Sequence, residues 1–566
     1  MSNNFRSNAE IIVTANVSGE IFECKEGLSF WGGVDPSTGC IVDVHHINHG
    51  NSLVGKLVLM PTSRGSCSGS GVLLQLVQNG LAPKALIFHE EEEILTLGAI
   101  VSDQLFNKKV AILRVSKDIY SDLAVADKAE IFENTLVCGS KTIKLRGLDT
   151  ETLNLNPTDR RMLNGDQGTA NKIAMEAICK MAAVQSANEL IDVTKGHIDG
   201  CILAHDANLI FAEKMYKLGA NVSIPTTINA ISVNRNNWEN QGVEPDFGNK
   251  ASRLADAYEK MGAHPTFTCA PYLLEDKPQR DEVIGWSESN AVIYANSILG
   301  AKTQKHPDYL DLFIAMTGRA PKAGVYLTEN RIPKIEISVL LPTDFDDSIW
   351  PMLGWLIGDL SPNKIPLVTG LEMTSPSDDD LKALCAAFGT TSAAPMLHIN
   401  GHTPGKVYSS PSNLKNFNIT KKHLAKLWNK FNYADLRVDL VAIGSPHASL
   451  KECQSFVKFF DGKNCHPNVK TIITIGRDIL SKAKSEGLVE QLRSAGVQII
   501  SDICWCSITE PIFPPEASVI MTNSGKYAHY AHGLTGRKTR FGSLKDCAIA
   551  AQSGWAKSEL PEWLSN

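Results

Sequence analysis

A short polar loop carries the residue types best suited to binding an anion. Residues 62–71, TSRGSCSGSG, follow the apolar run 56–61 and precede the apolar run 72–77, which leads to Gly80. These runs predict a buried strand, a polar loop, and a helix that stops at the glycine. Backbone N–H groups at a helix N-terminus favour an anion, and Arg64 adds a planar fork for a carboxylate or phosphate.

Two hydroxyl groups belong to the same loop. Ser66 and Ser70 stand where a helix N-terminus would stabilise a developing negative charge. A flexible Gly/Ser turn without a ligand is the alternative, because glycine and serine are also typical of linkers. An arginine is an unusual residue for a simple linker, and the loop is therefore predicted to bind an anion.

Three cysteines lie where a thiol could bind a metal. Cys269 is in an irregular loop between two prolines, and Cys504 and Cys506 follow an apolar run. Three thiolates could hold one metal centre and leave a position open for a substrate. The spacing is not that of a zinc finger, because the sequence has no CxxC pair, and each thiol could instead be an apolar filler of the core. Cys201 is the reserve ligand and is predicted to lie inside a strand.

The elements that must position these residues alternate between strands and helices. This alternation indicates parallel sheets that are covered by helices on both faces. Ligands bind at the carboxyl ends of the strands in such sheets. The predicted strands span residues 200–203, 221–225, 438–443, 471–475, 497–503 and 518–521.

Polar side chains gather at these predicted strand ends, and most of them are hydroxyl, amide, thiol or cationic groups. A shared cleft lined by them is therefore expected. His447 is the histidine best placed to act there, whereas His45, His46 and His49 could bind a metal or occupy a turn. The strand-end residues are Thr226, Thr227, Ser445, His447, Cys504, Cys506, Thr522, Asn523, Ser524 and Lys526.

The composition is that of a soluble globular protein. Of the 566 residues, 43% are apolar and 20% are charged, and the net charge is −6. These values argue against a nucleic-acid or anionic-membrane surface, which would need basic clusters. The first residues lack the pattern of a signal peptide, and no apolar run reaches the roughly 18 residues of a membrane span. The odd number of cysteines, 13, indicates free or metal-bound thiols in a reducing compartment, the cytoplasm.

The residue composition of the sequence changes near residue 146. Residues 1–145 are predicted to be mostly β, with short apolar strands at 56–61 and 85–89, and a polar segment rich in Gly and Pro follows. Two parts are therefore expected, residues 1–145 and residues 146–566.

Long motifs in both parts resemble those of the aconitase X family, and the resemblance covers nearly the whole chain. In the first part, two segments are similar to the family's small swivelling domain: FWGGVDPSTGCIVDVHHINHG and GKLVLMPTSRGSCSGSGVLLQLVQNGLAPKALI. In the second part, these segments are similar to the family's large domain: GAHPTFTCAPYL, GWSESNAVIYANSILGAKT, TGRAPKAGVYL, GSPHASL, SDICWCS, TNSGKYAHY and RFGSL.

The resemblance implies an aconitase-like α/β fold, with a small swivelling β/α domain followed by a large multi-layer α/β region with parallel sheets. The fused order of the two parts resembles the single-chain members, which are cis-3-hydroxy-L-proline dehydratases, whereas the split archaeal form acts on phosphomevalonate. The implied activity is that of a hydro-lyase that forms 1-pyrroline-2-carboxylate through an enamine. The archaeal pattern tends to carry a cysteine where this chain has Ser445.

The family also implies an iron centre, either an iron–sulfur cluster, with [2Fe–2S] among the forms considered, or a mononuclear iron. Its implied ligands are Cys269, Cys504 and Cys506, with Cys201 as an alternative to Cys506. The iron would act as a Lewis acid on the departing hydroxyl. Ser66 is carried over from the family as the proton acceptor.

The remaining roles surround this base. Arg64 and the helix N-terminus would supply the positive environment that a serine base needs, and His447 could protonate the leaving hydroxyl. Because the base and the iron lie on separate domains, a hinge near residues 140–165 is expected to close the cleft and exclude water. The substrate-binding residues of this hypothesis are Ser70, Thr226, Thr227, Asn523, Ser524 and Lys526.

Two alternatives stay open at this point. One is a dehydratase of another hydroxy acid, such as phosphomevalonate. The other is a non-catalytic protein that binds small anions in the loop between Arg64 and Ser70 and needs no iron. In each case the expected partner is a small molecule, with no nucleic acid and no membrane, and a monomer is expected because the two parts are already fused.

Overall fold

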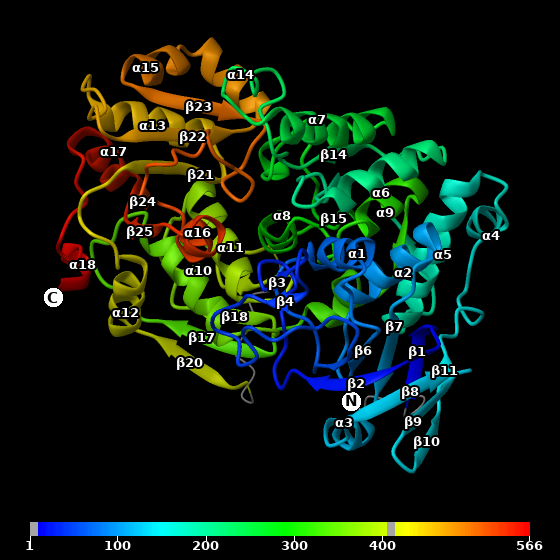
Figure 1. The fold of residues 1–566 in the computed structure, drawn as a ribbon. Coiled ribbons are helices and arrows are strands. Elements are labelled where there is room, and N and C mark those ends of the chain that lie inside the picture. Colours follow the sequence, from blue (N-terminus) through cyan, green and yellow to red (C-terminus); the bar gives the residue numbers. More distant parts are fainter. Residues whose placement is uncertain (1–8, 405–413, 566) are drawn as a thin grey trace.

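The N-terminal part of the chain is built on one nine-stranded sheet. The computed structural model describes residues 9–404 and 414–565. The strand order is β10-β9-β8-β2-β5-β6-β7-β1-β11 (Figure 1). β2, β5, β6 and β7 run parallel to one another, and β8, β9 and β10 form an antiparallel extension. The strands are β1 (Ala9–Val13), β2 (Val17–Glu23), β5 (Leu57–Leu59), β6 (Ala85–Phe88), β7 (Ala111–Val115), β8 (Lys128–Phe132), β9 (Thr135–Cys138), β10 (Lys141–Lys144) and β11 (Arg146–Gly147).

The two apolar runs of this part form strands as predicted. β5 and β6 are buried along their whole length because helices cover both faces of the sheet. α1 (Gly69–Asn79) and α2 (Ile94–Phe106) cover one face, and α3 (Lys117–Ala124) covers the other. α1 begins before the apolar run and ends at Gly80, whose φ of 71° gives the predicted left-handed stop. A small hairpin, β3 (Val34–Asp35) and β4 (Cys40–Ile41), precedes β5.

The next part of the chain holds a small parallel sheet in the order β14-β13-β15. The strand expected at residues 200–203 is wrong, because residues 200–202 form a turn after β13. The strand expected at 221–225 lies later, as β14, because residues 221–225 form the approach to it. The elements are α4 (Pro157–Asn164), α5 (Thr169–Val184), β12 (Leu190–Asp192), β13 (Gly196–Ile198), α6 (Asp206–Lys217), β14 (Thr226–Ile228), α7 (Pro245–Lys260), β15 (Gly285–Trp286), α8 (Ser289–Tyr294), α9 (Leu310–Thr317) and β16 (Arg319–Pro321).

Two more parallel sheets complete the fold. The first has the order β19-β18-β17-β20 and the second has the order β23-β22-β21-β24-β25. Alternating strands and helices therefore give parallel sheets, as predicted. The first group comprises β17 (Ile335–Val339), α10 (Ile349–Leu360), β18 (Pro366–Thr369), α11 (Asp378–Thr391), β19 (His398–Ile399), β20 (Asn416–Ile419) and α12 (Lys421–Phe431). The second comprises β21 (Leu440–Ala448), α13 (Leu450–Phe460), β22 (Lys470–Ile475), α14 (Arg477–Ser485), α15 (Leu488–Ser494), β23 (Val497–Ser501), β24 (Val519–Thr522), α16 (Gly525–Thr535), β25 (Lys538–Phe541), α17 (Leu544–Ser553) and α18 (Glu562–Ser565).

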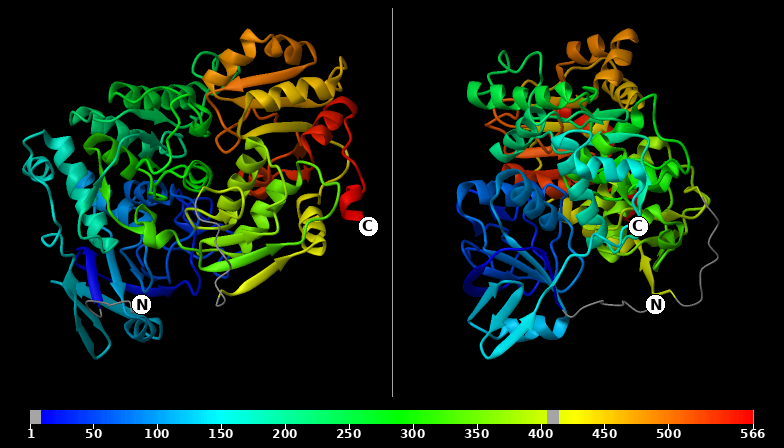
Figure 2. Two further views of the ribbon diagram at one scale, coloured as in Figure 1. Left: turned by 180° about the vertical axis from the view of Figure 1, so that it is seen from behind. Right: turned by 90° about the vertical axis from the view of Figure 1, so that its right-hand side faces the viewer.

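One apolar core continues from the N-terminal sheet into the rest of the molecule. It joins residues of α1 and α2 to residues of α5, α6 and α9, and Figures 1 and 2 show these helices packed side by side. We call the boundary where α1 and α2 meet α5, α6 and α9 the seam between the two parts. The polar loop before α1 lies at this seam and faces the second part of the chain. Among the described residues, no helix is long and apolar enough to cross a membrane.

Candidate active site at the seam between domains

The three predicted cysteines come together. Cys269 and Cys504 are buried beside Ala230, and the half-buried Cys506 packs against them. Hydrogen bonds from Cys269 and Cys506 hold the pKa of the Cys504 thiol well below its ordinary value, and the nearby charge of Lys526 acts in the same direction. The pKa values of Cys269 and Cys506 are raised in return, chiefly because each donates to Cys504. Cys504 thus interacts with both other thiols, although the three sulfurs are not among the groups of described residues whose ligand atoms all lie within 4.8 Å of one another. Cysteine thiols gathered in this way are donors that suit a soft metal.

His447 lies against this thiol cluster, inside β21. Its backbone N–H donates to the Cys269 sulfur at 3.4 Å. Its Nε2 donates to the Ile503 carbonyl at 2.8 Å, and its Nδ1 lies 3.2 Å from the Thr268 hydroxyl. Burial lowers the pKa of His447, so the ring is neutral near pH 7. Both ring nitrogens are therefore engaged by the loops that carry two of the cysteines.

A buried ion pair stands next to the thiols. Lys526, in the first turn of α16, donates to Glu288 at 2.9 Å, and the two side chains are 14% and 13% exposed. Asn290 and Asn229 also donate to the Glu288 carboxylate. Burial alone would raise the pKa of Glu288, but the charge and hydrogen bond of Lys526 and the hydrogen bond of Asn290 outweigh it and lower that pKa. The charge of Lys526 acts on all three thiols, so it offsets the negative charge of the cluster.

The polar loop approaches the same region from the N-terminal sheet. The buried Cys67 donates to Asp199 at 3.1 Å and lies 3.8 Å from the Ser287 carbonyl, next to Glu288. The Ser66 hydroxyl lies 3.9 Å from the Cys67 sulfur and 3.4 Å from the Ser68 hydroxyl. Gly65 permits this path, because its φ is 92° and a Cβ there would lie 2.3 Å from the Ser29 Oγ. Ser66 therefore directly precedes Cys67, the residue through which the loop contacts Asp199 and Ser287 of the large part of the chain.

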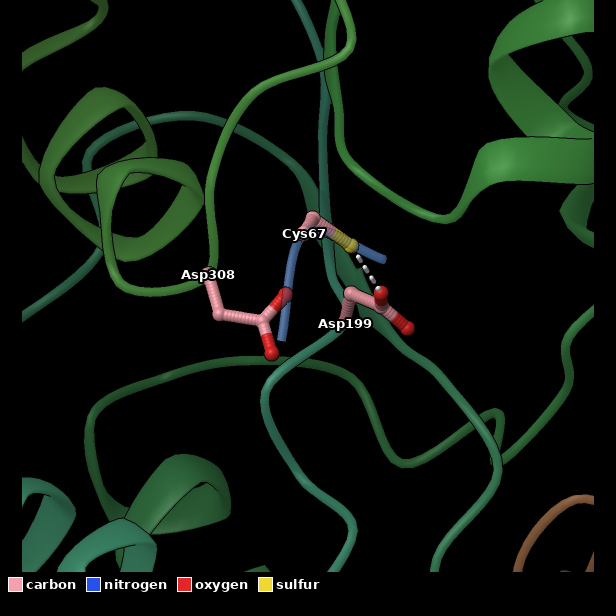
Figure 3. Close-up of side chains that lie close together, drawn as sticks. All are labelled: Cys67, Asp199 and Asp308. Atoms are coloured by element: carbon pink, nitrogen blue, oxygen red, sulfur yellow. Dashed lines mark hydrogen bonds between the residues drawn. The ribbon is translucent and has the colours of Figure 1, made fainter. Parts of the chain in front are cut away.

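Cys67, Asp199 and Asp308 form a compact buried group (Figure 3). The Cys67 sulfur and one oxygen of each carboxylate all lie within 4.8 Å of one another. Burial and the other nearby acids raise the pKa of Asp199, and they raise the pKa of Asp308 to about 6. The three residues come from the polar loop, from the end of β13 and from the start of α9, so the group spans the seam.

Other predicted residues are placed differently. Arg64 is exposed and lies 3.7 Å from Glu26 and 3.8 Å from Asp43. Ser70 is buried, and its hydroxyl bonds to the carbonyls of Cys67 and Asp308 at 3.0 and 3.2 Å. The Ser524 hydroxyl donates to the Ser445 carbonyl and caps α16, and Asn523 is half-buried just before it.

The two predicted threonines belong to β14 and make local contacts. Thr226 donates to the Ile224 carbonyl at 2.8 Å, and Thr227 lies 2.7 Å from Nδ1 of His197. Cys201 lies in the turn after β13, and its sulfur is 3.4 to 3.7 Å from four backbone carbonyls, those of Ile198, Asp199, Asn229 and Ala230. This turn replaces the strand in which Cys201 was expected. Of the loop histidines, His46 is buried while His45 and His49 are exposed.

The positions of several residues at the seam could not be predicted from the sequence alone. Glu288 precedes α8 and has the sequence context of a helix cap, but its side chain makes no cap bond and pairs instead with a lysine distant in the sequence. Asp199 and Asp308 occur as isolated acids, whose proximity depends on the fold. Cys67 is the exception, since it stands inside the loop that the sequence marks as functional.

Comparison with known proteins decides the family. The model described as the aconitase X swivel domain matches residues 6–138. Those described as the first, second and third aconitase X domains match residues 152–329, 333–429 and 438–553. Curated proteins named cis-3-hydroxy-L-proline dehydratase, from Hypocrea jecorina and Pseudomonas aeruginosa, are each 41% identical to the chain. Their alignments cover 98% of this chain and 96% and 98% of those proteins. The chain belongs to the aconitase X family.

More distant members of the aconitase X family agree with the fold. The crystal structure of Thermococcus kodakaraensis aconitase X in its holo-form has a TM-score of 0.65 and 28% identity, and it covers 70% of this chain and 100% of that chain. The phosphomevalonate dehydratase large subunit of Methanothermobacter thermautotrophicus is 29% identical over 68% of this chain and 94% of that protein. The predicted aconitase-like α/β fold is confirmed, while the division at residue 145 stays a prediction.

The thiol cluster fits the metal centre that the aconitase X fold suggests. The pKa of the Cys504 thiol is held well below its ordinary value, two further thiols adjoin it, and the positive charge of Lys526 acts on all three. Soft thiolate donors select iron–sulfur centres and related metals over hard cations. The seam group of Cys67, Asp199 and Asp308 has a different character, because two of its three donors are carboxylates.

Proposed function

We propose that this chain is a hydro-lyase that dehydrates cis-3-hydroxy-L-proline to 1-pyrroline-2-carboxylate. The two relatives with that printed activity match nearly the whole chain at 41% identity. The observation that carries the proposal is the Glu288–Lys526 pair, which lies between the thiol cluster and the loop that holds Ser66. This arrangement supports a proton acceptor in the polar loop that acts together with a metal centre at the thiol cluster.

The metal centre is proposed to be an iron–sulfur cluster or a mononuclear iron held by Cys269, Cys504 and Cys506. When bound, iron supplies a Lewis acid for a departing hydroxyl. The thirteen cysteines are all free in the structure, which fits thiols that serve a metal or the core. This state is the one expected in a reducing compartment, and we infer the cytoplasm from it.

Ser66 is the proposed acceptor of the proton on the carbon next to the substrate carboxylate. Arg64 would stabilise the resulting negative charge after leaving Glu26 and Asp43. Its two ion pairs are exposed and long, and pairs of this kind contribute at most about 1 kcal/mol, so Arg64 can turn toward the seam at little cost. Lys526, Asn523 and Ser524 are proposed to bind the substrate carboxylate, with Ser70, Thr226 and Thr227 shaping the site from behind.

The leaving hydroxyl departs as water and requires a proton, for which His447 is the proposed donor. Because the buried ring is neutral, Nδ1 must first take up a proton, which can arrive from solvent through the Thr268 hydroxyl. Nε2–H then leaves the Ile503 carbonyl and gives its proton to the departing oxygen. The enamine that remains tautomerises to the cyclic imine without a redox cofactor. Each bond change is thus assigned to a group at the seam.

The test is anaerobic turnover of cis-3-hydroxy-L-proline, followed by formation of the cyclic imine. Ser66→Ala should lower kcat by about 100- to 10,000-fold, the range for loss of a proton-transfer group. Ser121→Ala is the control, because the Ser121 hydroxyl donates to the Lys117 carbonyl within the same helix, α3, on an exposed side chain away from the proposed site. If Ser66→Ala forms the imine at the wild-type rate, the proposed reaction stands but Ser66 is not its base.

The alternatives give other outcomes in the same assay. Turnover of phosphomevalonate by a wild-type enzyme that forms no imine would assign the archaeal type of substrate. Binding of a small carboxylate or phosphate without turnover, by protein that carries iron, would favour a non-catalytic anion-binding role.

A further inference from the structure

The seam group contains buried carboxylates that have no positive partner. Asp199 is 7% exposed and Asp308 is 2% exposed. Elsewhere in the molecule, the buried Asp159 pairs with Arg319 and the buried Asp502 pairs with Arg477. Asp199 and Asp308 form no ion pair with any residue that the structure describes, although burying an unpaired charge is costly. Such a pair of acids is expected to receive a positive charge from a ligand.

A small cavity opens onto these carboxylates. Its volume is about 10 Å³, the space of about one water molecule, and Asp199, Asp308 and Asn208 line it. Two oxygens there lack a hydrogen-bond partner: Oδ1 of Asp308 and Oδ1 of Asn208, which is 5% exposed. Both are acceptors, so the cavity offers carboxylate and amide oxygens to a group that carries N–H donors or positive charge. Trp31 and His205 also form part of the wall.

We propose that this cavity is the subsite for the ring ammonium of the substrate, with Asp308 as its main acceptor and Asp199 and Asn208 in support. The inference rests on the proposed function for the identity of the ligand. A secondary ammonium group is the size of one water molecule and carries two N–H donors, so it matches both the volume and the unpartnered oxygens. The rest of the ring would remain outside the cavity, toward the polar loop.

The position of the base agrees with this subsite. In a proline derivative, the carbon that loses its proton is bonded directly to the ring nitrogen. The groups that hold the nitrogen must therefore lie within a few ångströms of the base. Ser66 is linked to Asp199 through Cys67, by contacts of 3.9 and 3.1 Å. A bound ammonium would also offset the negative charge of this pair of acids, which would otherwise oppose the negative charge that develops on the substrate.

The experiment compares two ligands that cannot be dehydrated. L-Proline carries the ring ammonium, and tetrahydrofuran-2-carboxylate has an oxygen in its place. Calorimetry on the iron-loaded protein should show that the wild type prefers proline and that Asp308→Asn loses about 10- to 150-fold in affinity for it, the range for a hydrogen bond to a charged group. Affinity for the oxygen analogue should change by less than about 3-fold. Asp308→Glu, which keeps the charge, should recover part of the loss.

Two further variants keep the test decisive. Asp206→Asn is the matched control, because Asp206 begins α6 beside the cavity wall but is exposed and pairs with Lys250; its ligand preference should equal that of the wild type. Asn208→Leu removes the second unpartnered oxygen with little change in volume, and it should lower proline affinity selectively even if Asp308→Asn fails to fold.

Other results would overturn the inference. Equal weakening of both ligands by Asp308→Asn, no change for either ligand, or no binding of either ligand to the wild type would each remove the ammonium subsite. A metal other than iron that is present in the wild type by native mass spectrometry, and lost in Asp308→Asn, would assign the cavity to that ion instead. Failure of the proposed function would be seen separately, as absence of imine from cis-3-hydroxy-L-proline while proline is still preferred over its oxygen analogue.

Discussion

Removing Lys526 should destabilise the protein through the carboxylate that it leaves behind. In Lys526→Met, the 13%-exposed Glu288 loses its cation but keeps amide donors from Asn290 and Asn229. Breaking a buried ion pair by deleting one partner costs about 3–5 kcal/mol. Because two amide bonds to the carboxylate remain, we expect the lower end of this range, about 3 kcal/mol in the free energy of unfolding.

The double variant Glu288→Gln/Lys526→Met separates charge from packing. Replacing both charges with neutral groups of similar size removes the uncompensated carboxylate, so stability should return to within about 1 kcal/mol of the wild type. Activity should not return, because the thiol cluster still lacks the positive charge that Lys526 provides. The double variant should thus regain the stability of the wild type but not its activity.

Urea unfolding of the metal-free proteins measures the cycle, and imine formation measures activity. Lys482→Met is the control, since Lys482 pairs with Glu275 at the surface, where both side chains are exposed; it should cost at most about 1 kcal/mol. If Lys526→Met is as stable as the wild type, or if the double variant is no more stable than Lys526→Met, the charge argument is refuted.

Three further predictions concern the thiols, the seam carboxylate and the loop. Cys504→Ser should abolish iron binding and its visible absorbance, whereas Cys385→Ser, a buried thiol in α11, should retain both. Burial raises the pKa of Asp308 from 3.8 to about 6, so the folded state holds its proton more tightly than the unfolded state. The free energy of unfolding of the wild type, taken relative to that of Asp308→Asn, should therefore be highest below the ordinary aspartate pKa and should fall by about 3 kcal/mol as the pH rises to 6.5. Urea unfolding of the two proteins across this pH range measures the difference. Gly65→Ala should lower kcat by about 100-fold through misplacement of Ser66, with an unchanged far-ultraviolet CD spectrum.

The sequence predicted those features whose causes are local. Short apolar runs mark β5 and β6, because strands buried on both faces need apolar residues at every position. Alternation of such runs with helical segments predicted the parallel sheets. The thiol cluster could be proposed because Cys504 and Cys506 follow an apolar run and Cys269 stands in an irregular loop. The strand itself, β23, ends earlier than the predicted 497–503, at Ser501.

The features that escaped prediction depend on contacts between distant residues. Glu288 and Lys526 are 238 residues apart, and nothing near either residue indicates its partner. Residues 200–203 were expected to form a strand, whereas residues 200–202 form a turn, and the Cys201 sulfur lies against carbonyls from both β13 and the segment after β14. The segment that carries His447 was expected to be a loop after a strand, but it belongs to an irregular end of β21. In each case the local pattern was compatible with two structures, and tertiary packing selected one.

The seam also narrows where the predicted hinge can act. β11 (Arg146–Gly147) still pairs with β1 of the N-terminal sheet, and Asn154 forms a bridge with Glu189 of the large part. The connecting residues 148–153 therefore lie between two anchored points, inside the expected span of 140–165. The apolar core shared by α1 and α2 with α5 and α6 would be exposed to water by full separation of the two parts, which is unfavourable in proportion to its area. A rotation that lifts the Ser66 loop from Asp199 while α2 stays packed on α5 would break the polar contacts of the seam and the packing of α1 on α6, but it would keep the rest of the shared core buried. We therefore expect an opening of this limited kind, rather than full separation, to admit a substrate.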